Sequence, residues 1–349
     1  MARGRDQWQR DLAESIDDGA DLCRRLGLPG DLARPNAFPL LVPRSFVDRM
    51  RPGDPHDPLL RQVLPAPDEL LSPPEFTADP LGEAELAGSS NTLWKYPNRL
   101  LIVTVARCAV HCRFCFRRHF FCHREGATND NWEGALERIA AEPSIHEAIL
   151  SGGDPLMLDD DRLADLVRRL AAVAHLTRFR VHTRMPIVLP SRVTPELVAV
   201  MRSTRLAPVV VVHANHVQEI DERVAAALAR LVDAGVVVLS QSVLLRGVND
   251  SVEALAALLE RLIDLRVMPY YLHQLDRVAG AAHFEVPEAE GVRLMRHLRE
   301  RLPGYAVPRY VRELPRGESK QMIEASAGLR TDRSTLIEFS RAGRCGAEP

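Results

Sequence analysis

The run Leu101-Ile-Val-Thr-Val-Ala106, followed after one arginine by Cys108-Ala-Val-His-Cys112-Arg-Phe-Cys115, decides how this chain folds. The apolar, β-branched run predicts a buried strand, and the three thiols follow it in a short loop. Thiols at this CxxxCxxC spacing can converge on one [4Fe–4S] cluster, and three cysteines leave one of its four irons open to a ligand that is not protein. A closed zinc site is the alternative, with His111, Cys122 or His123 as the fourth ligand. Unrelated buried thiols are another.

Composition narrows the class of protein. The 349 residues are 46% hydrophobic and 26% charged, which is ordinary for a globular protein, and the net charge of −2 gives no basic surface for nucleic acid. Apolar runs are too short to span a membrane, and the N-terminus has no secretory signal. Six cysteines, three of them clustered, do not form a disulfide framework. We therefore expect a cytoplasmic protein that binds neither nucleic acid nor membrane.

Lysine is almost absent. Of the 45 Lys and Arg residues, only Lys95 and Lys320 are lysines. Arginine has replaced lysine wherever a generic positive charge is enough. A remaining lysine is therefore a candidate for chemistry that guanidinium cannot perform, such as a Schiff base or a compact point-charge contact. Chance survival on the surface is the alternative.

Six apolar runs alternate with six amphipathic stretches. The runs predict strands at residues 101–106, 147–151, 179–183, 208–213, 236–244 and 268–274. Apolar spacings of three and four predict helices at residues 130–142, 160–174, 194–202, 220–234, 251–265 and 287–301. This alternation is typical of α/β proteins with a parallel sheet. We predict a partial (β/α)6 TIM-like barrel, with its chemistry at the carboxyl ends of the strands.

The barrel is expected to carry an extension at each end. Residues 5–27 show helical apolar spacing that stops at Gly27, and prolines are dense from about residue 31 to about residue 90. We predict a helical, proline-rich extension over 1–95, the barrel core over 96–285, and a C-terminal segment over 286–349 that carries Lys320. Cys23 is expected to pack in the core, and the roles of Cys122 and Cys345 stay open.

Polar residues follow several of the predicted strands. Ser151-Gly152-Gly153-Asp154 follows the second, and its paired glycines allow the backbone to approach a ligand closely, although Gly-Gly-Asp is also a good turn. His213 ends the fourth strand and Gln241 lies within the fifth. Both are placed to contact a bound cofactor, and a satisfied polar residue at a strand end is the alternative for each.

Charged residues complete the candidate site. Arg117 and Arg118 follow the third cysteine, where a guanidinium can hold a carboxylate or support a negatively charged cluster. Asp276 and Glu313 follow predicted strands, and two carboxylates in an apolar pocket are costly unless a cation joins them. A bound ammonium would serve, and two ordinary surface carboxylates are the alternative. Lys320 lies in a Pro/Gly turn that suits a lysine that must move.

The cysteine loop and the Ser151-Gly-Gly-Asp154 element together resemble the signature of radical S-adenosylmethionine (SAM) enzymes, in which the open iron binds SAM. Over residues 35–325 the chain is similar to the lysine 2,3-aminomutase family, which also uses pyridoxal 5′-phosphate (PLP). Further matching stretches are Tyr96-Pro-Asn-Arg99, His213-Ala-Asn-His216, Tyr270-Tyr-Leu-His-Gln-Leu-Asp276 and the Lys320 turn.

The resemblance implies a role for each candidate residue. Lys320 would hold PLP as a Schiff base, and Lys95 and Arg99 would contact its phosphate. Arg117 would hold the carboxylate of L-lysine, and Asp276 and Glu313 its ε-ammonium. The remaining implied ligands are Cys108, Cys112 and Cys115 for the cluster, Ser151, Gly152, Gly153 and Asp154 for SAM, and His213 and Gln241 for SAM or PLP.

Two departures point to a subgroup. Clostridial-type members have a cysteine where this chain has Ser251, and they have an aspartate where it has Glu313. The cysteine loop instead resembles a shorter bacterial branch that makes (R)-β-lysine for elongation factor P. This resemblance implies an isomerase with a flavodoxin- or ferredoxin-type reductant and a functional link to an elongation factor P lysyl ligase, and it leaves a homo-oligomer open. The alternatives are a catabolic lysine aminomutase, the same chemistry on glutamate, and a non-catalytic iron–sulfur or zinc protein.

Overall fold

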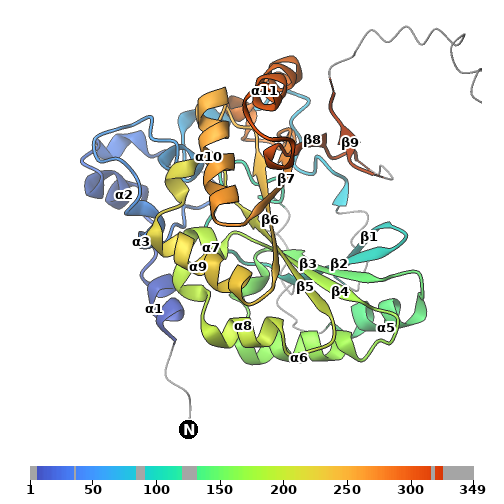
Figure 1. The fold of residues 1–349 in the computed structure, drawn as a ribbon. Coiled ribbons are helices and arrows are strands. Elements are labelled where there is room, and N and C mark those ends of the chain that lie inside the picture. Colours follow the sequence, from blue (N-terminus) through green and yellow to red (C-terminus); the bar gives the residue numbers. More distant parts are fainter. Residues whose placement is uncertain (1–5, 35–36, 84–90, 120–131, 316–318, 325–349) are drawn as a thin grey trace, which may run out of the picture.

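A nine-stranded sheet forms the centre of the protein, whose structure is a computed structural model (Figure 1). The structure describes residues 6–34, 37–83, 91–119, 132–315 and 319–324. The strands lie in the sheet in chain order, with β2 to β8 parallel and the edge strands β1 and β9 antiparallel to their neighbours. They are β1 (Thr92–Tyr96), β2 (Arg99–Val105), β3 (Glu147–Gly152), β4 (Arg178–Thr183), β5 (Ala207–His213), β6 (Val237–Val243), β7 (Met268–His273), β8 (Arg309–Arg312) and β9 (Gln321–Met322).

Helices connect successive parallel strands. Most begin at a side-chain cap: Asp159, Asp221 and Ser251 accept hydrogen bonds from the first turns of α6, α9 and α10. None of the described helices is long and apolar enough to cross a membrane. The helices are α1 (Gln7–Ala13), α2 (Gly19–Arg25), α3 (Arg44–Val47), α5 (Glu133–Ala141), α6 (Asp160–Ala171), α7 (Met185–Val188), α8 (Pro195–Met201), α9 (Glu222–Asp233), α10 (Val252–Asp264) and α11 (Glu288–Arg301).

The predicted β/α alternation is confirmed: all six strands and all six helices form close to their predicted positions. The sheet is larger than the prediction by β1, β8 and β9. Its strand order runs from β1 to β9 without joining these two edges, so the barrel is partial and open. Because β2 to β8 are parallel, the residues that follow them gather at one edge of the sheet.

The N-terminal extension packs beside the barrel. Ser45 and Arg49 donate to the carbonyl oxygens of Val188 and Ile187 in α7, at 2.7 Å each. The predicted helices over residues 5–27 are α1 and α2, and Gly27 after α2 has a positive φ of 68°. Cys23 is fully buried in the core, as predicted.

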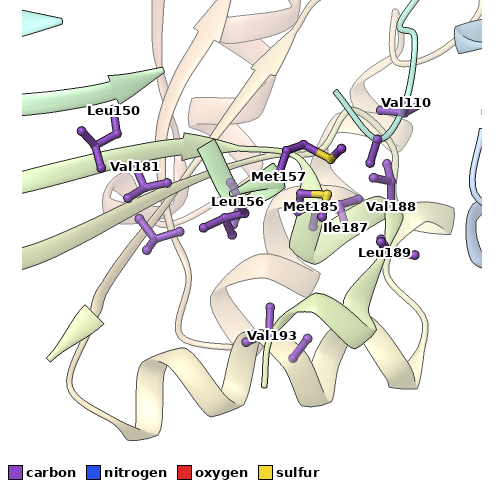
Figure 2. Close-up of a cluster of buried hydrophobic side chains, with 14 of the residues drawn as sticks. Val110, Leu150, Leu156, Met157, Val181, Met185, Ile187, Val188, Leu189 and Val193 are labelled. Atoms are coloured by element: carbon purple, nitrogen blue, oxygen red, sulfur yellow. The ribbon is translucent and has the colours of Figure 1, made fainter. Parts of the chain in front are cut away.

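One large apolar core lies between the sheet and the helices. Figure 2 shows part of it, with Leu150 on β3, Val181 on β4, and Leu156, Met157 and Met185 beyond the strand ends. All five side chains are at most 5% exposed, and burying each contributes roughly 1.5–3 kcal/mol. This packing fixes the carboxyl ends of β3 and β4, on which the candidate site is built.

Candidate functional site

The carboxyl ends of the parallel strands surround a cavity of about 440 Å³. This volume is within the usual range for a small-molecule site. Residues on or just after each strand from β2 to β8 line it. All the site residues predicted from the sequence, except Arg118, also line it. These are Lys95, Arg99, Cys108, Cys112, Cys115, Arg117, Ser151, Gly152, Gly153, Asp154, His213, Gln241, Asp276, Glu313 and Lys320.

The cysteine loop is held by the N-terminal extension. The backbone N–H groups of His111 and Arg113 donate to Leu41 and Gln62, at 2.9 Å each. The three cysteine thiols are free and line the cavity. His111 does not line it, because its ring stacks on Phe38 and its Nδ1 lies 3.0 Å from the Pro39 carbonyl oxygen. His111 is therefore not placed as a fourth zinc ligand, and the other candidates, Cys122 and His123, lie outside the described residues.

The thiols fit a cluster that binds thiolates. Burial raises the pKa of Cys108 well above its usual value and that of Cys115 to about 11, and the neighbouring cysteines add to both effects. The charge of Arg117 partly offsets this rise at both thiols, and Arg184 Nη1 donates to the sulfur of the third, Cys112 Sγ, at 2.8 Å. Arg184 follows β4 and also donates to Glu219 at 3.1 Å. Three thiols that line one cavity, one of them bonded to a guanidinium, provide the donor set of a three-cysteine [4Fe–4S] cluster.

The glycine-rich element follows β3 and packs against β2. A Cβ on Gly153 would overlap the Arg107 carbonyl oxygen and lie 2.7 Å from the Arg107 nitrogen, and one on Gly152 would lie 2.8 Å from the Val105 carbonyl oxygen. Gly152 also has a φ of +113°. The prediction explained these glycines by close approach of a ligand, but strand packing already requires both of them.

Asp154 is engaged by the protein itself. Its carboxylate accepts hydrogen bonds from Leu156 N at 3.0 Å, Thr183 Oγ1 at 2.7 Å, Arg184 N at 2.7 Å and Met185 N at 3.2 Å. It therefore joins the ends of β3 and β4 and orients Arg184 toward the cysteine loop. Its assignment to SAM stays a prediction.

His213 at the end of β5 and Gln241 within β6 lie side by side, and their Cα atoms are register partners. Burial, together with the charge of Arg184, lowers the pKa of His213 to about 3, so the ring is neutral at physiological pH. Its Nε2 lies 3.1 Å from Asn215 Oδ1. A neutral imidazole and an amide at one level of the cavity can bind a polar cofactor group without adding charge.

Glu313 brings together the two lysines of the chain. Lys95 Nζ lies 2.5 Å from Glu313 Oε1 and donates to the Leu314 carbonyl oxygen at 2.7 Å, while Lys320 Nζ pairs with Glu313 Oε2. Arg99, also predicted to contact phosphate, stacks on Tyr96 with its Cζ 3.7 Å from the ring centroid. Lys95, Arg99 and Lys320 all line the cavity, with Glu313 between the two lysines, so a phosphate-bearing cofactor could be contacted by more than one cation there.

Asp276 lines the same cavity without a cation. Its carboxylate has no hydrogen-bond or ion-pair partner among the described residues, and burial, reinforced by Glu313, raises its pKa to about 7. Asp276 is therefore about half protonated at neutral pH. A bound ammonium would favour its ionised form.

Arg117 and Arg118 separate in space. Arg117 lines the cavity and forms a two-point ion pair with Glu83, at 2.6 Å and 2.8 Å. Arg118 lies away from the cavity, where it donates to Glu69 at 2.6 Å and to the Gly280 carbonyl oxygen at 3.1 Å. Of the two arginines, Arg117 is the one placed to hold a ligand carboxylate.

Sequence reasoning missed several cavity residues. His182 on β4 has a buried Nε2 without a hydrogen-bond partner within the described structure, and burial lowers its pKa far below the usual value. His273 on β7 is likewise neutral, with a pKa of about 3 caused by burial and by Lys320. Both lay inside predicted strands, so a histidine within a strand was the available signal. Glu83 and Arg184 had no such signal.

The fold and the cysteine loop define a radical SAM protein. The model of the radical SAM superfamily matches residues 102–259, which include the second half of β2, the three cysteines and β3 to β6.

Comparison with individual proteins identifies the family within this superfamily. L-lysine 2,3-aminomutase of Escherichia coli (strain K12) is 45% identical over 92% of this chain and 95% of its own length. The L-lysine 2,3-aminomutase of Haemophilus influenzae is 41% identical over 93% of this chain and 97% of its own length. The enzyme of Clostridium subterminale is 36% identical over 80% of this chain and 67% of its own length. The chain belongs to the lysine 2,3-aminomutase family of radical SAM enzymes. This family is a family of isomerases, and membership implies a [4Fe–4S] cluster, SAM and PLP.

Proposed function

We propose that this chain is a PLP-dependent lysine 2,3-aminomutase that converts L-lysine into (R)-β-lysine. The observation that carries the proposal is the sorting of charge in one cavity, where Arg117 can bind a carboxylate and Asp276 and Glu313 can bind an ammonium. L-lysine carries both groups. Glutamate would place a second carboxylate beside Asp276 and Glu313, which would repel it.

Each part of the chain has a defined task. Cys108, Cys112 and Cys115 would hold the [4Fe–4S] cluster to which SAM binds. Lys320 would hold PLP, and Lys95 and Arg99 would contact its phosphate. When bound, these groups supply the radical and imine chemistry that moves nitrogen to the neighbouring carbon. The protein positions L-lysine between its charged groups and excludes water.

The finer proposal is that the product serves elongation factor P. The near-complete coverage of the Escherichia coli and Haemophilus influenzae relatives, against 67% of the clostridial one, supports placement with the shorter enzymes. We propose that an elongation factor P lysyl ligase consumes the β-lysine. We also propose that a flavodoxin or ferredoxin delivers the electron in the cytoplasm.

The test uses anaerobically purified enzyme with about four iron and four sulfide per chain. With SAM, reductant and L-lysine it should form β-lysine, and chiral chromatography should identify the R enantiomer. Turnover of L-glutamate instead of L-lysine would refute the substrate. Supplying the product to a purified ligase and elongation factor P tests the finer proposal, which predicts a mass increase of one lysyl group.

The two lysines give a simple test of PLP attachment. Borohydride reduction followed by peptide mass spectrometry should find the PLP adduct on Lys320 and none on Lys95. Lys320→Ala should lose the adduct, while Lys95→Ala, the matched control, should keep it. An adduct on Lys95 would overturn the assignment of Lys320.

A further inference from the structure

Glu83 holds one edge of the guanidinium of Arg117. Arg117 Nε donates to Glu83 Oε2 at 2.6 Å and Nη2 donates to Oε1 at 2.8 Å. The two side chains are only 9% and 14% exposed, and both line the cavity. This is a buried, two-point ion pair, whose planar geometry fixes the orientation of the guanidinium as well as its charge.

The opposite end of the guanidinium is less fully engaged. Nη1 donates to Ser151 Oγ and to the Gly152 carbonyl oxygen, each at a long 3.2 Å. A guanidinium has five N–H donors, so these two contacts and the two to Glu83 leave one N–H of Nη2 without a partner among the described residues. This N–H of Nη2 can donate to a ligand carboxylate, and Nη1 can join it by exchanging one of its two 3.2 Å contacts.

Glu83 is itself fixed to the cavity wall. Its N–H donates to Asp79 Oδ1 at 3.0 Å, which closes the turn Asp79-Pro-Leu-Gly-Glu83. The preceding strand-like residue Thr77 bonds to the loop after β7: its N–H donates to Arg277 at 2.9 Å, and its carbonyl accepts from Ala279 at 2.9 Å. The segment that leads into Glu83 is thus tied, at Thr77, to the loop that follows Asp276.

We propose that Glu83 is a positioning residue for substrate binding: it holds the Nε–Nη2 edge of Arg117 so that the Nη1–Nη2 end faces the carboxylate of the substrate. This inference rests on the proposed function, which assigns the substrate carboxylate to Arg117. It adds a second task, because a guanidinium released from Glu83 would be free to pair with Asp276, the nearby carboxylate without a cation. Glu83 keeps Asp276 available for the ammonium at the other end of the substrate.

The experiment compares Glu83→Gln with the wild-type holoenzyme. Glutamine keeps the shape and removes the charge. We expect the KM for L-lysine to rise about tenfold to a hundredfold while kcat changes less than about threefold, because misplacing a substrate-binding group costs affinity of this order. Calorimetric titration of L-lysine into the holoenzyme without reductant should show the same loss of affinity. Glu83→Asp, which keeps the charge, should recover part of it.

Two controls separate positioning from general damage. Glu285→Gln removes an ion pair with Arg277 at the exposed surface, at 2.8 Å, and should leave L-lysine binding unchanged. Binding of L-lysinamide, which lacks the carboxylate, should be almost equal in wild type and Glu83→Gln, whereas a merely structural role would weaken binding of both ligands.

Three results would overturn the inference: tighter L-lysine binding by Glu83→Gln, which would make Glu83 a competitor of the substrate; unchanged binding; or equal losses for L-lysine and L-lysinamide. If Glu83→Gln fails to fold, Glu83→Asp is used to test the inference. Its shorter side chain should weaken the binding of L-lysine but not that of L-lysinamide. Failure of the wild type to bind L-lysine would instead refute the proposed function.

Discussion

Lowering the pH from 8 to 6 should weaken the binding of L-lysine through protonation of Asp276. The carboxylate of Asp276 is buried without a cation partner among the described residues, and its pKa is raised to about 7, first by burial and then by Glu313. In the proposed site, only its ionised form would attract the ε-ammonium of L-lysine. Below pH 7 the bound ammonium must therefore compete with a proton.

The size of the effect follows from the fraction of Asp276 that is ionised. With a pKa of about 7, roughly nine-tenths is ionised at pH 8 and roughly one-tenth at pH 6. The apparent affinity scales with the competent fraction, so it should fall about tenfold, or about 1.4 kcal/mol. Glu313 does not titrate in this range, because its two lysine neighbours overcome the effect of burial and lower its pKa below the usual value.

The assay is calorimetric titration of L-lysine into the holoenzyme from pH 6 to pH 8, for the wild type and for Asp276→Asn. The α-amino group of the substrate also titrates, although above this range. The pH dependence of L-lysine affinity is therefore compared between the wild type and Asp276→Asn. Asp276→Asn should bind weakly and lose the tenfold dependence. An equal pH dependence in both proteins would show that Asp276 is not the ammonium site.

Three further predictions concern the support of the site. Lys95→Met removes an ion pair to Glu313 and a hydrogen bond to Leu314. The free energy of unfolding, measured by heat or urea, should therefore fall by about 2 kcal/mol, and an unchanged value would mean that the pair does not stabilise the fold. Gly153→Ala forces a Cβ into the backbone of Arg107 and should lower the free energy of unfolding, measured in the same way, by more than about 3 kcal/mol. A variant as stable as the wild type would contradict the close approach of Gly153 to Arg107. Arg184→Met leaves Glu219 buried without its cation, so the free energy of unfolding should fall by about 3–5 kcal/mol. The iron content after reconstitution should also fall, because Arg184 no longer donates to Cys112; full iron content would refute this support by Arg184.

The sequence predicts the fold because local patterns determine it. The valines at 209–212 and the capped amphipathic helix α9 identify one β/α unit without knowledge of any contact between them. The edge strands are not predicted from such local patterns. β9 has two residues, and its pairing with β8 comes from backbone hydrogen bonds, which leave no pattern in such a short segment.

The members of the site are predictable, whereas their partners are not. Residues that follow parallel strands meet at one edge of the sheet, so placing Cys108, Asp276 and Glu313 after strands already places them together. The partners come from distant segments: 34 residues separate Glu83 from Arg117, and 218 separate Lys95 from Glu313. No spacing rule connects such pairs, because their contact depends on how the N-terminal extension packs on the barrel.

The charges of the cavity indicate where a substrate ammonium gains most by binding. Four acidic side chains line the described cavity, and two of them already have cations: Glu83 pairs with Arg117, and Glu313 pairs with both lysines. Compact ammonium groups can occupy the two oxygens of one carboxylate separately, whereas a planar guanidinium takes both. Asp154 accepts four hydrogen bonds, which leaves Asp276 as the acid in this cavity lining with neither cation nor donor. We therefore expect an incoming ammonium to bind Asp276 first and to share Glu313 once Lys320 releases it.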